Sequence, residues 1–419
     1  MKRKLLINSS LLVVERFTVL FFSFASALLM ARYAGAELFG QFSSIVAFGS
    51  LFLVFTQMGL NNVSSKYFTL YPNNTAFYLF AAIGVRLVFS VAIIPLAYLC
   101  GLLALDSTEA ALVALLVALQ VGNAATVIEF FFIAKQEVAT TLVPRLLIKL
   151  SCKLALILAI LWESPIVIWV LLSGAEYALL AMAYLFLLRR QPPLKKAQLN
   201  TAKRMYKGAG ILLHRGKWLL LSSLAAVMYL KIDQVMLASM IGDQEVAYYA
   251  AAAKLSEFWY VLPVLIANVF MPRLVSLYHA NKFQYWRLQR HFYAYSTVAA
   301  VAVITLTLWL AEPIILFLFG DAYRSSIAIL QVHIFGCLFI FSRAFMSRWL
   351  ILSNNHKLSL HSHLMGAVVN VLLNILLIPH YGGIGAAIAS VVAYGIAGIG
   401  FMVFFSSTRT YLKALLKNG

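Results

Sequence analysis

The sequence predicts an all-α membrane protein with about twelve transmembrane helices in two halves of six. Of its 419 residues, 63% are hydrophobic, whereas soluble domains contain about 45–50% apolar residues. The mean hydropathy is +0.90. A water-soluble fold cannot bury that much apolar surface, so the bilayer must act as the solvent. A spanning helix needs ~20 mainly apolar residues, and the chain is long enough for about twelve of them.

The predicted spans follow the apolar runs in chain order. The first half contains 5–31, 38–62, 77–102, 109–134, 140–162 and 165–188, and the second contains 217–241, 246–272, 293–319, 325–350, 358–378 and 383–406. The start, Met1-Lys-Arg-Lys followed by apolar residues, resembles a signal peptide. Its apolar run is longer than a signal-peptide core, so we expect an uncleaved first span.

The charge of the connecting loops alternates along the chain. One side carries mainly basic residues, with Lys66, Lys135, Arg145, Lys149, Arg273, Lys282, Arg287, Arg290 and Lys357; the other carries most of the acids, with Asp106, Glu109, Glu163, Asp243, Glu245 and Asp321. Both termini fall on the basic side. By the positive-inside rule, we expect a multi-pass membrane protein with both termini in the cytoplasm.

The formal net charge of +19 has the same explanation. In a soluble protein it would suggest nucleic acid, but here the basic residues lie between apolar runs, where anionic membrane lipid accounts for them. The three cysteines have no metal-ligand spacing and predict no disulfide framework. We therefore expect no nucleic-acid partner, no metal and no cofactor.

A basic linker separates the two halves. The predicted organisation is an N-terminal six-helix lobe at 1–188, a cytoplasmic linker at 189–216, a C-terminal lobe at 217–406 and a cytoplasmic tail at 407–419. We interpret the linker as an orientation signal lying on anionic lipid, with partner docking as the alternative. Its part from Leu199 to Leu213 has the pattern of an amphipathic surface helix.

The two halves share a short repeat. Ala31–Phe42 (ARYAGAELFGQF) aligns without gaps on Ala238–Tyr249 (ASMIGDQEVAYY), and each segment joins the first two spans of its half. Repeats of the same direction place a transport site between the halves.

Ionisable residues inside the predicted spans are the candidate functional groups, because charges at membrane depth are costly and usually face a bundle interior or a wet cavity. The candidate anion-binding cations are Arg16, Arg86, Lys153, Lys231, Lys254 and Arg343. The candidate ion-coupling carboxylates are Glu15, Glu176, Asp233 and Glu257, with Glu129 as a further acid near a span end.

Mutual pairing is the alternative role for these charges. Lys254 and Glu257 are three residues apart and share a helix face. Glu15 and Arg16 point in different directions, and Lys231 and Asp233 lie on nearly opposite faces, so these need partners elsewhere. Asp233 is a candidate for a structural tie to a neighbouring span as well as for a role in transport.

Four motifs resemble the polysaccharide flippase family, the Wzx-type exporters of O-antigen and related lipid-linked oligosaccharides. They are Arg32–Gly40, Ile232–Met236 followed by Gly242–Tyr249, Phe319–Tyr323 and Leu373–Ala387. One departure is that Gly40 of the first repeat corresponds to Ala247 in the second. That family shares a superfamily with lipid II flippases and multidrug extruders.

The resemblance implies two six-helix lobes around a central cavity, working by alternating access. It implies an undecaprenyl-type polyprenyl-pyrophosphate-linked oligosaccharide as cargo in the biosynthesis of lipopolysaccharide or another surface polysaccharide, with polysaccharide polymerase and assembly proteins as further partners. For such a cargo, aromatic side chains near the cavity are candidates for stacking on sugars, with packing as the alternative role: Tyr229, Tyr248, Tyr249, Trp259 and Tyr260.

Two other functions compete with this interpretation. A multidrug antiporter carries cationic cargo, which the excess of candidate cations over acids disfavours. A membrane enzyme of polysaccharide assembly needs catalytic groups on larger outward loops than those predicted here. No GxxxxGK[ST] loop is present for ATP, so we expect a proton or sodium gradient to drive transport, and we expect no enzymatic activity.

Overall fold

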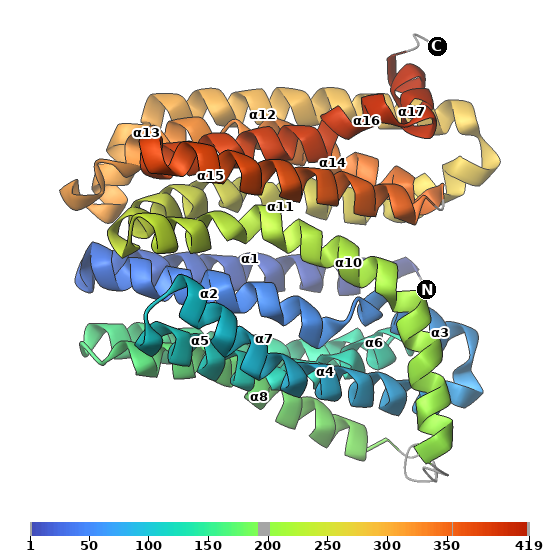
Figure 1. The fold of residues 1–419 in the computed structure, drawn as a ribbon. Coiled ribbons are helices and arrows are strands. Elements are labelled where there is room, and N and C mark those ends of the chain that lie inside the picture. The colour runs from blue at the N-terminus through green and yellow to red at the C-terminus, as the bar shows by residue number, and fades with distance from the viewer. Residues whose placement is uncertain (1, 192–201, 354, 417–419) are drawn as a thin grey trace. The chain divides into compact units, whose positions relative to one another are not determined.

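The computed structural model describes residues 2–191, 202–353 and 355–416, and these residues contain helices but no strands. The predicted all-α fold class is confirmed. The chain forms two compact units, Met1–Val227 (unit 1) and Met228–Gly419 (unit 2). Figure 1 shows the helices of both units in chain order.

Unit 1 contains eight α-helices, two short 3-10 segments and the first half of a long helix within its described residues. They are α1 (Lys2–Tyr33), α2 (Gly35–Gln57), α3 (Leu60–Leu70), η1 (Pro72–Asn74), α4 (Thr75–Ala104), α5 (Ser107–Leu119), η2 (Gln120–Thr126), α6 (Val127–Ala134), α7 (Val138–Leu161), α8 (Ile166–Arg189) and the start of α10 (Ala202–Met240).

Unit 2 continues α10 and adds the remaining helices. They are α11 (Asp243–Ala280), α12 (Lys282–Phe319), η3 (Asp321–Tyr323), α13 (Ser326–His333), α14 (Gly336–Leu352), α15 (His356–Gly395), the π-helical η4 (Ile396–Gly400), α16 (Phe401–Phe404) and α17 (Ser406–Leu416). Several helices extend beyond the predicted spans, because helical hydrogen bonds are local and continue outside an apolar stretch.

Ten helical stretches in the described residues are long and apolar enough to cross a membrane. The other two predicted spans also have structural counterparts. Helix α7 covers 140–161 of the predicted span 140–162 but carries Arg145, Lys149 and Lys153. The last two predicted spans lie in one stretch, Lys357–Phe404, which is broken at Gly382 (φ 53°, ψ −133°). The chain is thus a multi-pass membrane protein, and the count of twelve stays a prediction.

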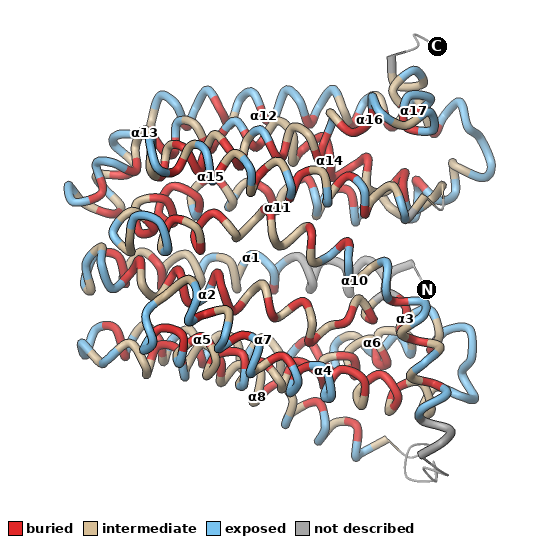
Figure 2. The backbone as a smooth tube through the Cα atoms, viewed as in Figure 1, coloured by how far each residue is buried: buried red, intermediate tan, exposed pale blue. Residues whose placement is uncertain are grey.

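Each unit buries one side of its helices and exposes the other. In Figure 2, α12 carries exposed residues along one edge and buried residues elsewhere along its length. Large apolar side chains are exposed in both units, including Leu103, Trp162, Trp309 and Phe317. Apolar surface of this extent on membrane-length helices is suited to contact with lipid.

Most of the predicted linker that the structure describes belongs to unit 1. Residues 192–201, including Leu199, lie outside the described residues. From Ala202 onward the chain is helix α10, and Leu212 is fully buried in the core of unit 1. Gly208 lies against Phe77 and Gly216 lies against Leu60. The boundary between the two units lies inside α10, after Val227, whereas the predicted C-terminal lobe begins at residue 217.

The C-terminal helix α17 packs on the end of unit 2. The Tyr411 ring lies 4.4 Å from Trp349 and 5.4 Å from Trp286, and its hydroxyl donates to Tyr293 Oη at 3.1 Å. Burial raises the pKa of Tyr411 well above its ordinary value, and the neighbouring Tyr293 adds to this. The predicted tail thus begins as a docked helix, while residues 417–419 lie outside the described residues.

A close approach of two helical segments at Gly122 offers a test of this packing. A Cβ at Gly122 would lie 2.4 Å from the carbonyl oxygen of Tyr177, which is backbone and cannot move aside. We expect Gly122→Ala to lower the stability of the purified protein by about 1–3 kcal/mol, as overpacking does. The measurement is a thermal unfolding curve in detergent.

The matched control is Gly210→Ala in α10, where a Cβ meets nothing within 4 Å. It should leave stability unchanged or raise it by up to about 1 kcal/mol, since alanine favours helix. Equal unfolding temperatures for the two variants would contradict the close packing at Gly122.

Candidate functional site

An ion pair between α10 and α11 lies within unit 2's membrane-spanning helices. Lys231 Nζ lies 3.0 Å and 3.1 Å from the two carboxylate oxygens of Glu257. Lys231 is nine residues before Met240, the end of α10, which is about 14 Å along the helix. The hydrocarbon core is ~30 Å thick, so a charge at this distance from the helix end lies within the part of α10 long and apolar enough to span a membrane.

The pair is partly exposed at that depth. The side chain of Lys231 is 29% exposed and that of Glu257 is 26% exposed. Lys254, one helical turn before Glu257, is exposed as well. Because charged groups facing hydrocarbon are costly, this patch of three charges is suited to a water-accessible surface. Glu257 is paired directly with Lys231, and Lys254, to which the sequence spacing pointed, lies within electrostatic range of the same carboxylate.

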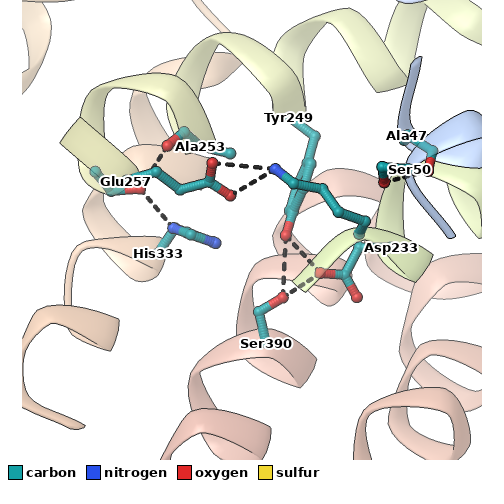
Figure 3. Close-up of polar contacts among 10 residues, drawn as sticks. Ala47, Ser50, Asp233, Tyr249, Ala253, Glu257, His333 and Ser390 are labelled. Atoms are coloured by element: carbon teal, nitrogen blue, oxygen red, sulfur yellow. Dashed lines mark hydrogen bonds and ion pairs between the residues drawn. The ribbon is translucent and has the colours of Figure 1, made fainter. Parts of the chain in front are cut away.

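Asp233 is the centre of a buried hydrogen-bond cluster that joins three helices. It lies on α10 and is fully buried. Its Oδ2 accepts from Tyr249 Oη at 2.7 Å and from Ser390 Oγ, while its Oδ1 accepts from Asn370 Nδ2 at 2.9 Å and Asn374 Nδ2 at 2.6 Å. Figure 3 shows Tyr249 and Ser390 converging on the carboxylate.

This cluster gives both carboxylate oxygens of Asp233 neutral donors only. No Lys or Arg of the described residues forms an ion pair with it. Asp233 therefore ties α10 to α11 and α15, as one of its two predicted roles required. Its other predicted role, in ion coupling, stays a prediction.

Arg343 is a buried cation held by neutral acceptors in unit 2. It lies on α14 and donates from Nη1 to the carbonyl of Ala397, inside the π-helical segment η4. Its Nη2 contacts Ser362 Oγ at 3.0 Å and His363 Nε2 at 2.8 Å. The His363 ring stacks on Tyr229 at 5.6 Å. Within the described residues, no carboxylate pairs with Arg343.

Arg86 is the corresponding buried cation of unit 1. It lies on α4 with no exposed surface. Its guanidinium donates to Asn61 Oδ1 at 2.5 Å and to Thr126 Oγ1 at 3.4 Å, and its Nε has no hydrogen-bond partner in the described part of the chain. A second polar contact lies beside it, since Asn123 Nδ2 donates to Thr56 Oγ1 at 2.7 Å.

Unit 1 also contains a cluster of one arginine and two acids. Arg145 donates to both oxygens of Glu15, at 2.7 Å and 2.5 Å, and forms an ion pair with Glu129. The three side chains are between 10% and 18% exposed. The position of Arg145 near the start of a predicted span indicated a loop-side residue. The structure instead places it inside α7 and joins it to α1 and α6.

The remaining predicted residues are less central. Arg16 is exposed on α1, as expected from its direction relative to Glu15, and Lys153 is half-buried on α7. Glu176 forms an ion pair with Lys149 at 3.6 Å. Of the aromatic candidates, Tyr229, Tyr249 and Tyr260 are buried, while Tyr248 and Trp259 are half-buried.

Several cluster residues were not identified from sequence because they are neutral. Asn370, Asn374 and Ser390 carry no charge to mark them, and His333 was not considered among the membrane-depth groups. One signal was available: Asn370 and Asn374 are four residues apart in an apolar span, so they share one helix face. Two amides on one buried face indicate a polar partner on the facing helix.

The chain is similar to known proteins in both of its halves. A family model described as "Polysaccharide biosynthesis protein" matches residues 5–278, and a model described as "Lipid II flippase MurJ" matches residues 176–417. Capsular polysaccharide biosynthesis protein CapF of Staphylococcus aureus is 25% identical over 175 residues, which cover 42% of this chain and 44% of that protein. The match thus spans less than half the length of this curated relative.

Two solved structures are similar over nearly the whole chain. Lipid II flippase MurJ in an inward closed conformation has a TM-score of 0.72 at 15% identity, with 96% of this chain and 89% of that chain covered. A multidrug resistance MATE family transporter of the MOP superfamily, facing inward, has a TM-score of 0.73 at 12% identity, with 96% and 98% covered. These likenesses establish the fold.

The Arg145 cluster predicts a large loss of stability on truncation. Arg145→Ala leaves two mostly buried carboxylates without their cation, and breaking such a pair costs about 3–5 kcal/mol. We expect a clearly lower unfolding temperature in detergent. Adding Glu15→Gln and Glu129→Gln to Arg145→Ala should recover part of the loss, because no unpaired charge remains.

The control is Arg324→Ala, whose ion pairs with Glu312 and Asp321 are exposed. Exposed pairs contribute about 0–1 kcal/mol, so this variant should unfold near the wild-type temperature. An Arg145→Ala protein as stable as Arg324→Ala would show that the cluster does not hold unit 1 together.

Proposed function

Because the chain belongs to the polysaccharide biosynthesis protein family, we propose that it flips a polyprenyl-pyrophosphate-linked oligosaccharide across the bacterial inner membrane by alternating access. The family comprises Wzx-type flippases within the MOP superfamily. The cargo is a repeat unit of O-antigen or another surface polysaccharide. The activity is transport and not catalysis.

The partly exposed charged patch of unit 2 carries this proposal. Lys231 and Lys254 supply two positive charges against the one negative charge of Glu257, so the patch has a net charge of +1 within the membrane-spanning helices. A pyrophosphate entering the hydrocarbon region needs cations to replace the water that it loses. A patch with an excess of cations on a wet surface meets that need, while the lipid tail stays in the bilayer.

Buried arginines in each unit add to the positive potential. Arg86 and Arg343 both donate to neutral acceptors, and the described residues pair no carboxylate with either. A buried charge is screened less than one at the surface, so its field reaches further. A positive potential favours an anionic cargo over the cationic compounds that a multidrug antiporter carries.

We propose that Asp233 carries the coupling ion, a proton or a sodium ion. Each of the other candidate carboxylates is engaged in an ion pair: Glu15 with Arg145, Glu176 with Lys149 and Glu257 with Lys231. Asp233 is bound by neutral donors only. A cation arriving there meets a negative charge that no arginine or lysine of the described residues offsets.

The distribution of basic residues supports an orientation with both termini and the 189–216 segment in the cytoplasm. In that orientation the lipid-linked cargo enters from the leaflet where it is assembled. Polymerase and other assembly proteins would receive it on the opposite side.

Removing the excess positive charge tests the proposed cargo. Lys254→Gln lowers the net charge of the patch from +1 to 0 and keeps the Lys231–Glu257 pair. One charge-assisted contact is worth about 1.5–3 kcal/mol, so we expect translocation of a lipid-pyrophosphate oligosaccharide in vesicles to fall about tenfold or more. Lys282→Gln, an exposed lysine at the start of α12, is the matched control and should transport normally.

Two outcomes would contradict the proposal that the cargo is a lipid-linked oligosaccharide. Normal translocation by Lys254→Gln removes the patch from the substrate path. A wild-type protein that moves no lipid-linked sugar but expels cationic drugs is a multidrug antiporter.

The coupling role of Asp233 is tested by a pair of substitutions. In Asp233→Asn, the amide oxygen still accepts from Asn370 and Asn374, and the amide nitrogen can donate to the hydroxyls of Tyr249 and Ser390, which rotate to accept. We expect this variant to fold at the wild-type unfolding temperature and to lose the dependence of transport on an imposed ion gradient.

Asp233→Leu, by contrast, removes the acceptor that four buried donors share and should be destabilised. Asn374 still donates to Asn370. One of the Tyr249 and Ser390 hydroxyls can donate to the other, but the Asn370 amide and one hydroxyl are left without an acceptor, and each costs about 1–3 kcal/mol. Gradient-driven transport by Asp233→Asn at the wild-type rate would leave Asp233 with a structural role alone.

A further inference from the structure

His333 lies at a break in a membrane-spanning stretch of unit 2. It is the last residue of α13, and α14 begins at Gly336, so the stretch Ser326–Leu352 is interrupted in its interior. The His333 side chain is fully buried. Breaks in spanning helices are tolerated where buried polar groups or cavity water satisfy the freed backbone.

The contacts of Ser256 determine which ring nitrogen of His333 carries the hydrogen. Ser256 Oγ donates to the carbonyl of Ala253 at 3.0 Å and lies 2.6 Å from His333 Nδ1. A serine hydroxyl has one hydrogen. Both contacts are therefore satisfied together only when Nδ1–H donates to Ser256 Oγ. In a neutral ring, Nε2 is then a bare acceptor.

Two tyrosines surround the same ring. The ring of Tyr260 stacks on His333 at 6.4 Å, that of Tyr394 meets it edge-on at 6.0 Å, and the two tyrosine rings are 6.1 Å apart. Gly336 makes room for them, because a Cβ there would lie 2.6 Å from Tyr260 Oη and 2.9 Å from the Tyr394 ring.

Three buried polar atoms of this group lack a well-aligned hydrogen bond in the described part of the chain. They are His333 Nε2, Tyr394 Oη and Tyr260 Oη; the Tyr260 hydroxyl also lies within interaction range of Ser256. Leaving each unsatisfied costs about 1–3 kcal/mol. Buried water typically makes about three hydrogen bonds to such groups. One acceptor and two hydroxyls on mutually adjacent rings supply that number.

The group lies between two of the charged sites of unit 2, the Lys231–Glu257 pair and the Asp233 cluster. On one side, Ser256 precedes Glu257, and Glu257 and Lys231 are the charged side chains within electrostatic range of His333. On the other side, the Tyr249 ring meets His333 edge-on at 5.6 Å, and the Tyr249 hydroxyl donates to Asp233. Figure 3 shows His333 beside Glu257, and Tyr249 reaching to Asp233.

We propose that His333, Tyr260 and Tyr394 form an internal water-binding site, and that this site passes protons between Glu257 and Asp233. Water donates a proton to Nε2 and is reprotonated from the side of Glu257. The imidazolium then releases the Nε2 proton through water to Tyr249 Oη while Tyr249 passes its own hydroxyl proton to Asp233, so the neutral ring and the tyrosine are restored and Asp233 gains one proton. The relay rests on the proposed ion-driven transport, whereas the water site does not.

The water site is tested by magnetic resonance on histidine-¹⁵N-labelled protein in lipid vesicles. We expect His333, assigned by the signal that disappears in His333→Gln, to be protonated at Nδ1 and to show magnetisation transfer from water at Nε2. Tyr260→Phe with Tyr394→Phe keeps both rings and should remove the water contact. Tyr285→Phe, which removes a buried hydroxyl elsewhere in unit 2, should leave it intact.

Exposed His361 of the same unit serves as the internal reference. A neutral His333 protonated at Nε2, or one without water contact in the wild type, overturns the site.

The relay is tested by proton movement during cargo transport, followed with a pH-sensitive dye inside vesicles. We expect His333→Phe, and Tyr260→Phe with Tyr394→Phe, to lower proton movement at least tenfold, while Tyr285→Phe behaves as wild type. Unchanged proton movement in both variants overturns the relay. A wild-type protein that moves no cargo contradicts the proposed function, and the resonance measurement still decides the water site.

Discussion

A charge inside a bilayer must find its partner within the protein, because hydrocarbon offers none. Three groups of contacts in this protein follow from that constraint. Lys231 and Glu257 join α10 to α11, Arg145 joins α7 to α1 and α6, and Asp233 joins α10 to α11 and α15. Apolar helices packed in lipid gain little from hydrophobic burial, so these polar contacts determine which helices are neighbours.

The helix breaks of both units accompany the buried polar groups. In unit 1, the 3-10 segment η2 supplies Thr126 to Arg86. In unit 2, the π-helical segment η4 supplies the Ala397 carbonyl to Arg343, and the break at Gly382 lets Gly383 N donate to Glu245 at 2.7 Å. A break frees backbone groups that a continuous helix would use internally. In unit 2 the backbone itself thus satisfies two of the charges, whereas in unit 1 the broken segment contributes a side-chain hydroxyl.

The short sequence repeat corresponds to equivalent turns of the chain. Gly35 is the first residue of α2, just after the end of α1, with φ 83°, and Gly242 lies between α10 and α11 with φ 124°. Both are conformations that residues with a side chain rarely adopt. The replacement of Gly40 by Ala247 falls inside helix, where φ is ordinary, and Ala247 is fully buried in α11. The glycine that the turn requires is therefore the one that both halves retain.

The sequence by itself determined the fold class, the apolar spans and the set of charges at membrane depth. It also showed that Lys231 and Asp233 need partners elsewhere, since a helix repeats every 3.6 residues and these two lie on nearly opposite faces. Helical periodicity is readable because its hydrogen bonds join residues four apart. Only the tertiary structure decided the partners, since these contacts join residues 26, 130 and 157 positions apart. No local pattern distinguishes Glu257 as the partner of Lys231, marks Arg145 as a buried cation or brings His333 beside two tyrosines, because each depends on which helices pack together.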